Sequence, residues 1–178
     1  VARLLGSVAS AQPLTFTDRG RIVLNVSAVD IQSSYRAPLR LPNVEHEFVQ
    51  TPEAAARRWA QDRLQGFGTL RERAVFTVTD ASVIETKLPR TPGVQGVLRD
   101  DQSERYDATL KVELAIFAGE TRVAQVLAEA TASRSVPESI TVAGRRNAFA
   151  EINRALMQQL DRTLESEIRR NLGRFLVN

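Results

Sequence analysis

The sequence contains no cysteine and a single histidine, His46. Without cysteine the chain has no disulfide, zinc–thiolate site, iron–sulfur cluster or cysteine nucleophile. His46 is the one histidine that a Ser-His-Asp triad could use. A site with several histidine ligands would need a second molecule. These two absences favour an interaction domain over an enzyme, and we expect no catalytic residue, cofactor or metal ligand set.

Lysine is also scarce, because Lys87 and Lys111 are the only lysines among 24 basic residues and the rest are arginines. The formal net charge is only +3. Arginine pairs occur at 57–58, 145–146 and 169–170, but acidic residues are interleaved with the arginines of the last predicted helix, a pattern typical of a solvated, salt-bridged face. Aromatic residues make up 6% and do not alternate with arginine as in base-stacking platforms. Nucleic-acid binding is therefore not expected, although a cytosolic module for an anionic partner such as RNA remains the alternative.

No window after the first residues reaches the roughly 18 apolar residues that a membrane-spanning helix needs. Residues 1–12 contain one arginine, a short apolar stretch and Ala9-Ser10-Ala11, which resembles the end of a secretory signal. A disordered leader, or a stretch that follows an upstream anchor, fits the same residues. We therefore assign residues 1–18 to a leader and 19–178 to a single domain, a length at which one core suffices.

Apolar periodicity predicts an α+β fold, a mainly antiparallel four-stranded sheet with two helices on one face in the order β-α-β-β-β-α. Thr51 is a good N-cap and Pro52 suits the first helical position. Near Asp80 the apolar residues change from even to odd positions, and this parity change predicts a bulge. The alanine-rich last strand could also be a helix, but its apolar residues keep a period of two. The predicted strands are 21–31, 74–88, 106–117 and 122–135, and the helices are 51–66 and 144–172.

Two acidic clusters are candidate sites. Glu45-His46-Glu47 places two carboxylates beside an imidazole, but neighbouring residues of an extended segment point to opposite sides, so a loop or capping role is favoured over a metal site. Asp100 and Asp101 lie in the polar loop 89–103, which lacks the spacing of a calcium loop and is interpreted as solvated charge. A hydrolase of unknown type is the third hypothesis.

The carboxyl terminus is the candidate partner-binding surface, because its apolar residues follow the last helix and are expected to extend past the sheet edge. Fraying of this end is the alternative. Trp59 lies on an alanine stripe and is expected to be a core anchor. The candidate partner-binding residues are Phe175, Leu176, Val177, Arg169 and Arg170.

Five segments carry a resemblance to known proteins: 43–46, 54–60, 80–85, 104–107 and 134–138. With them, the whole pattern resembles uncharacterised proteobacterial envelope proteins, many of them lipoproteins, and the order of elements is similar to that of auxiliary lipoproteins of ABC-type transport systems. This resemblance implies a periplasmic location, with any lipid anchor upstream of Val1, and a role in binding a partner. The leading hypothesis is a non-enzymatic accessory domain that binds another envelope protein or a lipid-like ligand between its sheet and helices.

Overall fold

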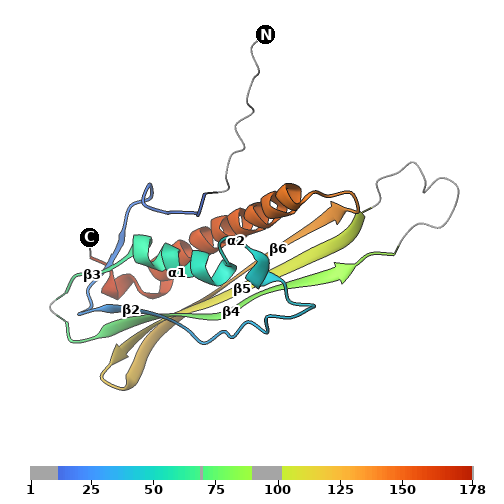
Figure 1. Cartoon of the computed structure of the whole chain (residues 1–178). Coiled ribbons are helices and arrows are strands. Elements are labelled where there is room, and N and C mark those ends of the chain that lie inside the picture. Colours follow the sequence, from blue (N-terminus) through green and yellow to red (C-terminus); the bar gives the residue numbers. More distant parts are fainter. Residues whose placement is uncertain (1–11, 69, 90–101, 178) are drawn as a thin grey trace, which may run out of the picture.

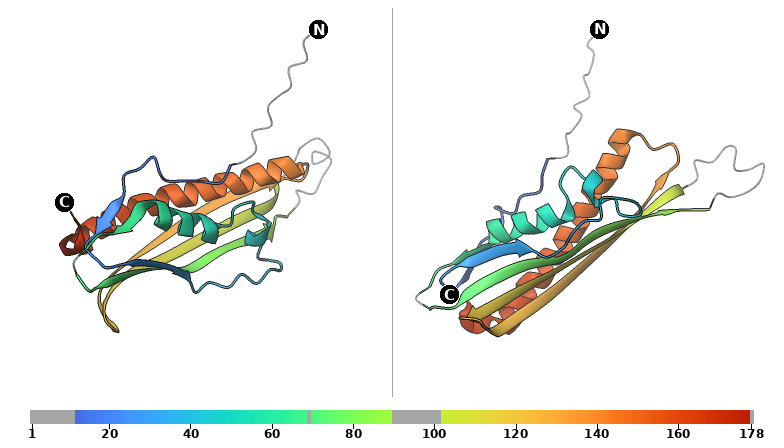
Figure 2. Two further views of the ribbon diagram at one scale, coloured as in Figure 1. Left: turned by 60° about the vertical axis from the view of Figure 1, so that its left-hand side comes forward. Right: turned by 60° about the horizontal axis from the view of Figure 1, so that its bottom comes forward.

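The structure, a computed structural model, describes residues 12–68, 70–89 and 102–177. A twisted sheet is covered on one face by two helices, α1 (Pro52–Arg63) and α2 (Val142–Asn171) (Figures 1 and 2). The α+β class and the two helices are thus confirmed. The signal-like residues 1–11 and most of the acidic loop 89–103 lie outside the described residues.

The main sheet has four strands in the spatial order β2-β4-β5-β6, and it is mixed rather than wholly antiparallel. The three long strands form an antiparallel meander, whereas the short β2 runs parallel to β4. A second, two-stranded parallel sheet joins β1 to β3. The strands are β1 (Ile22–Leu24), β2 (Val29–Ser33), β3 (Leu64–Gly66), β4 (Arg73–Lys87), β5 (Gln102–Ala118) and β6 (Thr121–Pro137).

The prediction of one strand over 21–31 was wrong, because the chain leaves the first sheet at Leu24 and enters the second at Val29. Both resulting strands pair in parallel with strands that follow α1. Parallel pairing is the geometry that a helical crossover gives, since the chain must return to the same end before it pairs. The predicted order of elements was therefore incomplete, because it lacked β3 and the break near Asn25.

The observed meander of β4, β5 and β6 agrees more closely with the prediction from the sequence. Its register shifts between Val78 and Asp80, as the parity change predicted. The alanine-rich segment is the strand β6, joined to β5 by a tight turn in which Gly119 has φ 62°, the left-handed region that favours glycine. Buried Ala128 and Ala130 leave room for α2 close to the sheet.

Both helices are capped by threonine, since Thr51 accepts a hydrogen bond from the Ala54 N–H at 3.1 Å and Thr141 accepts one from Gly144 at 3.0 Å. Helix α1 ends at Arg63, earlier than predicted, because Leu64 is extended and begins β3. Among the described residues, none of the helices combines the length and apolarity that crossing a membrane requires.

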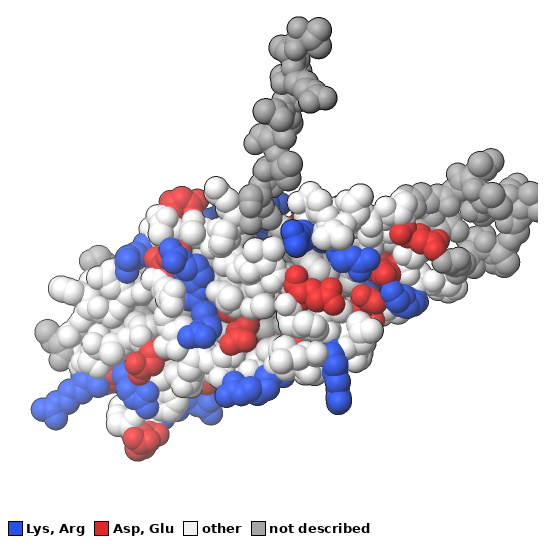
Figure 3. All heavy atoms as spheres, in the orientation of Figure 1, with Lys and Arg blue, Asp and Glu red and all other residues white. Residues whose placement is uncertain are grey.

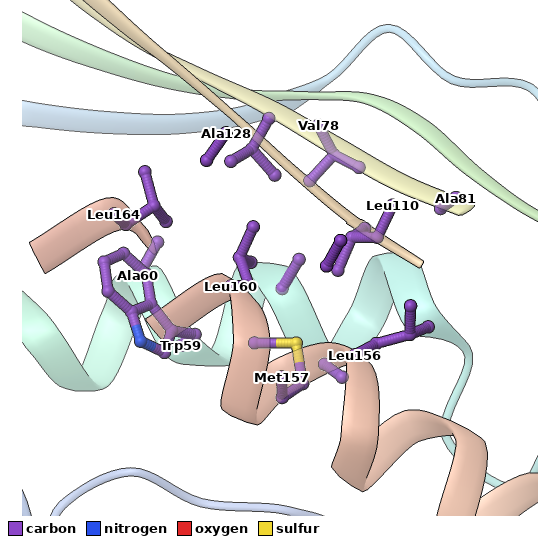
Figure 4. Packing of buried hydrophobic residues seen from close by; sticks show 14 of the residues in the cluster. Trp59, Ala60, Val78, Ala81, Leu110, Ala128, Leu156, Met157, Leu160 and Leu164 are labelled. Atoms are coloured by element: carbon purple, nitrogen blue, oxygen red, sulfur yellow. The ribbon is translucent and has the colours of Figure 1, made fainter. Parts of the chain in front are cut away.

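The core fills the space between the sheet and the helices (Figure 4). Trp59 of α1 is fully buried there, as expected, at 5.9 Å from the ring of Phe76 on β4. From α2, side chains three or four residues apart enter the same layer and meet Val78, Leu110 and Ala128 of the sheet. The α2 residues of this layer that Figure 4 labels are Leu156, Met157, Leu160 and Leu164.

Candidate functional site

The segment 12–19, named here the strap, lies across the outer side of the helix pair before the chain descends to β1 (Figure 1). Leu14 and Phe16 are half-buried and pack against the core. The Leu14 N–H donates to Gln50 Oε1 at 2.8 Å, and the Phe16 N–H donates to Asp62 Oδ2 at 2.9 Å. Part of the stretch assigned to a leader is therefore docked on the helices.

One buried carboxylate ties the strap to both helices. Asp161 of α2, 3% exposed, accepts a hydrogen bond from Trp59 Nε1 at 2.7 Å and another from Arg19 of the strap at 2.6 Å. Arg63 of α1 is also 3% exposed and lies 3.3 Å from the same carboxylate. A buried carboxylate needs such partners, because an unpaired buried charge is strongly destabilising.

Three cavities adjoin the strap, and Leu14 lines all of them. The first, of about 60 Å³, lies between the strap, the turn 48–50 and the first half of α2. The second, of about 350 Å³, separates the strap from α1, and the third, of about 180 Å³, continues along α2. On this side of the molecule, basic and acidic side chains are scattered among uncharged ones (Figure 3).

The first cavity has an apolar wall and one buried polar atom without a partner among the described residues. The rings of Phe48 and Phe149 are stacked at a centroid distance of 4.3 Å, and Leu14 and Ala150 complete the apolar part. Asn153 is 3% exposed and donates through Nδ2 to the Gln50 carbonyl. Its Oδ1 is buried and accepts no hydrogen bond within the part of the chain that the structure describes.

Arginines surround this hollow face, and they differ in their pairing. Arg58 forms an ion pair with Asp62, and Arg19 forms one with Asp161. Arg146 and Arg154 line the first cavity, are exposed, and have no ion pair or hydrogen bond to any other described residue. The described lining of that cavity contains no acidic side chain, so its mouth is positively charged.

The carboxyl-terminal candidates lie elsewhere, at the end of the molecule where β1 begins. Phe175 is 5% exposed and belongs to the core, while Leu176 is half-buried and pairs with Leu24. The Val177 N–H donates to Val23 O at 3.0 Å, so this tail pairs with β1 rather than fraying. Val177 is 39% exposed, and its role in binding a partner stays a prediction.

The two arginines grouped with the tail are engaged on the surface of α2. Arg169 pairs with Glu165 at 2.8 Å and Arg170 pairs with Glu167 at 3.1 Å, as the interleaved charges predicted. Their role in binding a partner also stays a prediction.

The residues around His46 do not converge on one point. Glu45 is 2% exposed and accepts hydrogen bonds from the Tyr35 hydroxyl at 2.5 Å and from the Val83 N–H at 3.1 Å. His46 points to solvent. Within residues 12–68, 70–89 and 102–177, no group of three or more His, Asp or Glu side chains is placed to hold a metal ion.

No protein-family model matches the chain, and no curated protein matches it. Among solved structures, it is similar to the rare lipoprotein B of Shewanella oneidensis, with 17% identity over 79% of this chain and 92% of that one and a TM-score of 0.40. It is also similar to a DUF330 protein of Xanthomonas campestris, with 10% identity over 89% of this chain and 92% of that one and a TM-score of 0.35. The first neighbour is a lipoprotein by name, the class that this sequence resembles. At such TM-scores the likeness carries no argument about what this chain does.

Proposed function

We propose that the chain is a non-enzymatic accessory domain of the cell envelope that binds a lipid-like ligand or an apolar segment of another envelope protein on the outer side of its helix pair. The resemblance of the sequence to envelope lipoproteins supports the envelope location. An auxiliary role in a transport system belongs to the same proposal. A coding sequence with neither a signal sequence nor a lipobox upstream of Val1 would contradict the location.

The observation that supports binding is the set of hollows along the strap. Three cavities that share Leu14 lie over α1 and α2, and the first has a wall of stacked Phe48 and Phe149. A concave hollow with an apolar wall and a few polar groups, as in the first cavity, is the usual form of a ligand site. The space between sheet and helices, where the sequence placed the ligand, is filled by the core. The proposed site is therefore the outer side of the helices.

A neutral apolar dye tests this site without involving charge. N-phenyl-1-naphthylamine becomes fluorescent in an apolar site, and the purified protein is expected to bind it saturably. The variant Ala150→Trp places an indole in the first cavity, which Ala150 lines, and should reduce dye binding at least several-fold.

The matched control is Ala155→Trp, which adds the same ring to an exposed position of α2 that lines none of the three cavities. Melting curves of both variants establish that they are folded. Equal dye binding by the wild type and by Ala150→Trp would overturn the proposal, as would an equal loss in both variants.

A further inference from the structure

We propose that the first cavity, with Arg146 and Arg154 at its rim, binds a single-chain anionic amphiphile, with the apolar chain against the wall of stacked Phe48 and Phe149 and the acidic headgroup at the two arginines. This inference rests on the proposed function and specifies its ligand.

The cavity suits the end of an aliphatic chain. Its volume of about 60 Å³ holds roughly four to six groups the size of a water molecule, at about 10–15 Å³ each. The third cavity, of about 180 Å³, shares Leu14 and Arg154 with the first and extends the hollow along α2. A straight chain can extend from the first cavity into the third.

The charge of the rim selects the headgroup. Arg146 and Arg154 are eight residues apart on α2, about 12 Å along the helix axis at 1.5 Å per residue, and both line the first cavity. Because neither arginine has a partner among the described residues, a carboxylate or phosphate would be their first counter-ion. A cationic headgroup would be repelled, and a neutral one would gain nothing from them.

Asn153 adds a further requirement. Its buried Oδ1 has no donor among the residues that the structure describes, and a buried acceptor without a partner is destabilising. An N–H or O–H group next to the headgroup of the ligand would satisfy this oxygen. An N-acyl amino acid has this donor between its chain and its carboxylate, whereas a simple fatty acid lacks it.

The test compares ligands of one chain length by calorimetry, each below its micellar concentration. Decanoate should bind at least tenfold more tightly than decanol or decyltrimethylammonium, and its affinity should fall as salt is raised. N-decanoylglycine should bind more tightly than decanoate by about three- to tenfold, the usual value of one hydrogen bond. Inorganic phosphate, which has no chain, should not bind measurably.

Matched variants locate the headgroup. The double variant Arg146→Ala, Arg154→Ala should weaken decanoate binding by roughly 3- to 30-fold, in the range of two exposed charge contacts, and should leave decanol binding unchanged. Arg162→Ala removes an exposed α2 arginine that lines none of the three cavities and should change neither. Asn153→Leu should abolish the advantage of N-decanoylglycine over decanoate.

The outcomes separate this inference from the proposed function. Equal affinity for the anionic, neutral and cationic ligands, with loss of all three in Ala150→Trp, would overturn the inference and leave an apolar site. Binding of phosphate as tight as that of decanoate would overturn it in favour of a simple anion site. If neither the neutral dye nor any of the amphiphiles binds, the proposed function is also overturned.

Discussion

Glu104 on β5 shows how one nearly buried carboxylate organises its neighbours. It accepts hydrogen bonds from Lys87 Nζ, the Tyr106 hydroxyl and Arg145 Nη1, each at 2.6 Å. Burial alone would raise the pKa of the Glu104 carboxyl, but these three donors outweigh burial and lower the pKa to about 2. The same burial, together with the carboxylate, raises the pKa of the Tyr106 hydroxyl, so that group stays a donor. The network links two strands to the first turn of α2.

This pKa shift predicts a pH-dependent stability. A carboxyl whose pKa is lower in the folded chain than its ordinary value of 4.5 stabilises the fold above pH 4.5, and the contribution is lost as the pH falls towards 2. Glu104→Gln should therefore lower the free energy of unfolding by about 2–3 kcal/mol at pH 7, the value of hydrogen bonds to a charged group. The difference between wild type and variant should shrink steadily between pH 4.5 and pH 2, measured by urea unfolding.

Glu120→Gln is the control for this prediction, because Glu120 is exposed at the β5–β6 turn and has no ion pair within the described residues. It should change the free energy of unfolding by less than about 0.5 kcal/mol at any of these pH values. A loss for Glu104→Gln that stays the same from pH 7 to pH 3 would show that the carboxylate charge does not contribute.

At the scale of elements, local signals predicted most of the fold. The Thr51 cap, the three- and four-residue spacing of α2 and the parity change near Asp80 are each visible in a short window of sequence. The break near Asn25 is not visible in such a window. Ile22, Leu24 and Val26 keep their alternation while the chain turns from one sheet to the other. Such a turn depends on which distant strand lies alongside, and periodicity contains no information about that partner.

The distant partner here is the segment after α1, and Gly68 permits its close approach. A Cβ on Gly68 would lie 2.7 Å from Val26 N and would also clash with Asn25 Oδ1, closer than real contacts allow. Gly68→Ala should therefore force the backbone apart at the junction of the two sheets and lower the free energy of unfolding by about 1–3 kcal/mol, as overpacking does. Gly173→Ala is the matched control, since a Cβ there meets nothing within 4 Å. Equal stability of the two variants in urea unfolding would contradict the close approach.

At the scale of the whole molecule, the candidate site combines parts that are distant in the sequence. The strap, the turn 48–50 and α2 each contribute to the first cavity, and no motif spacing joins Leu14 to Asn153. The alternation of Leu14 and Phe16 with Pro13 and Thr15 was the one signal that residues 12–18 are docked. A sequence could reveal the elements of this site, but the cavity appears only when the strap is placed on the helices.

The strap should also be the least stable part of the site, because its described ties are side-chain contacts rather than a ladder of backbone hydrogen bonds. Gln50 makes two of these ties, accepting from the Leu14 N–H and donating to the Leu14 carbonyl. Gln50→Ala should speed the amide exchange of Leu14 by roughly 3- to 10-fold, the value of about one hydrogen bond, while amides in the middle of β5 keep their rates. Gln61→Ala, on the exposed side of α1, has no tie to the strap within the described residues and should leave Leu14 unchanged. If Leu14 instead exchanges as slowly as β5 in the wild type, the strap opens only with global unfolding, and a ligand must enter the cavities beside it.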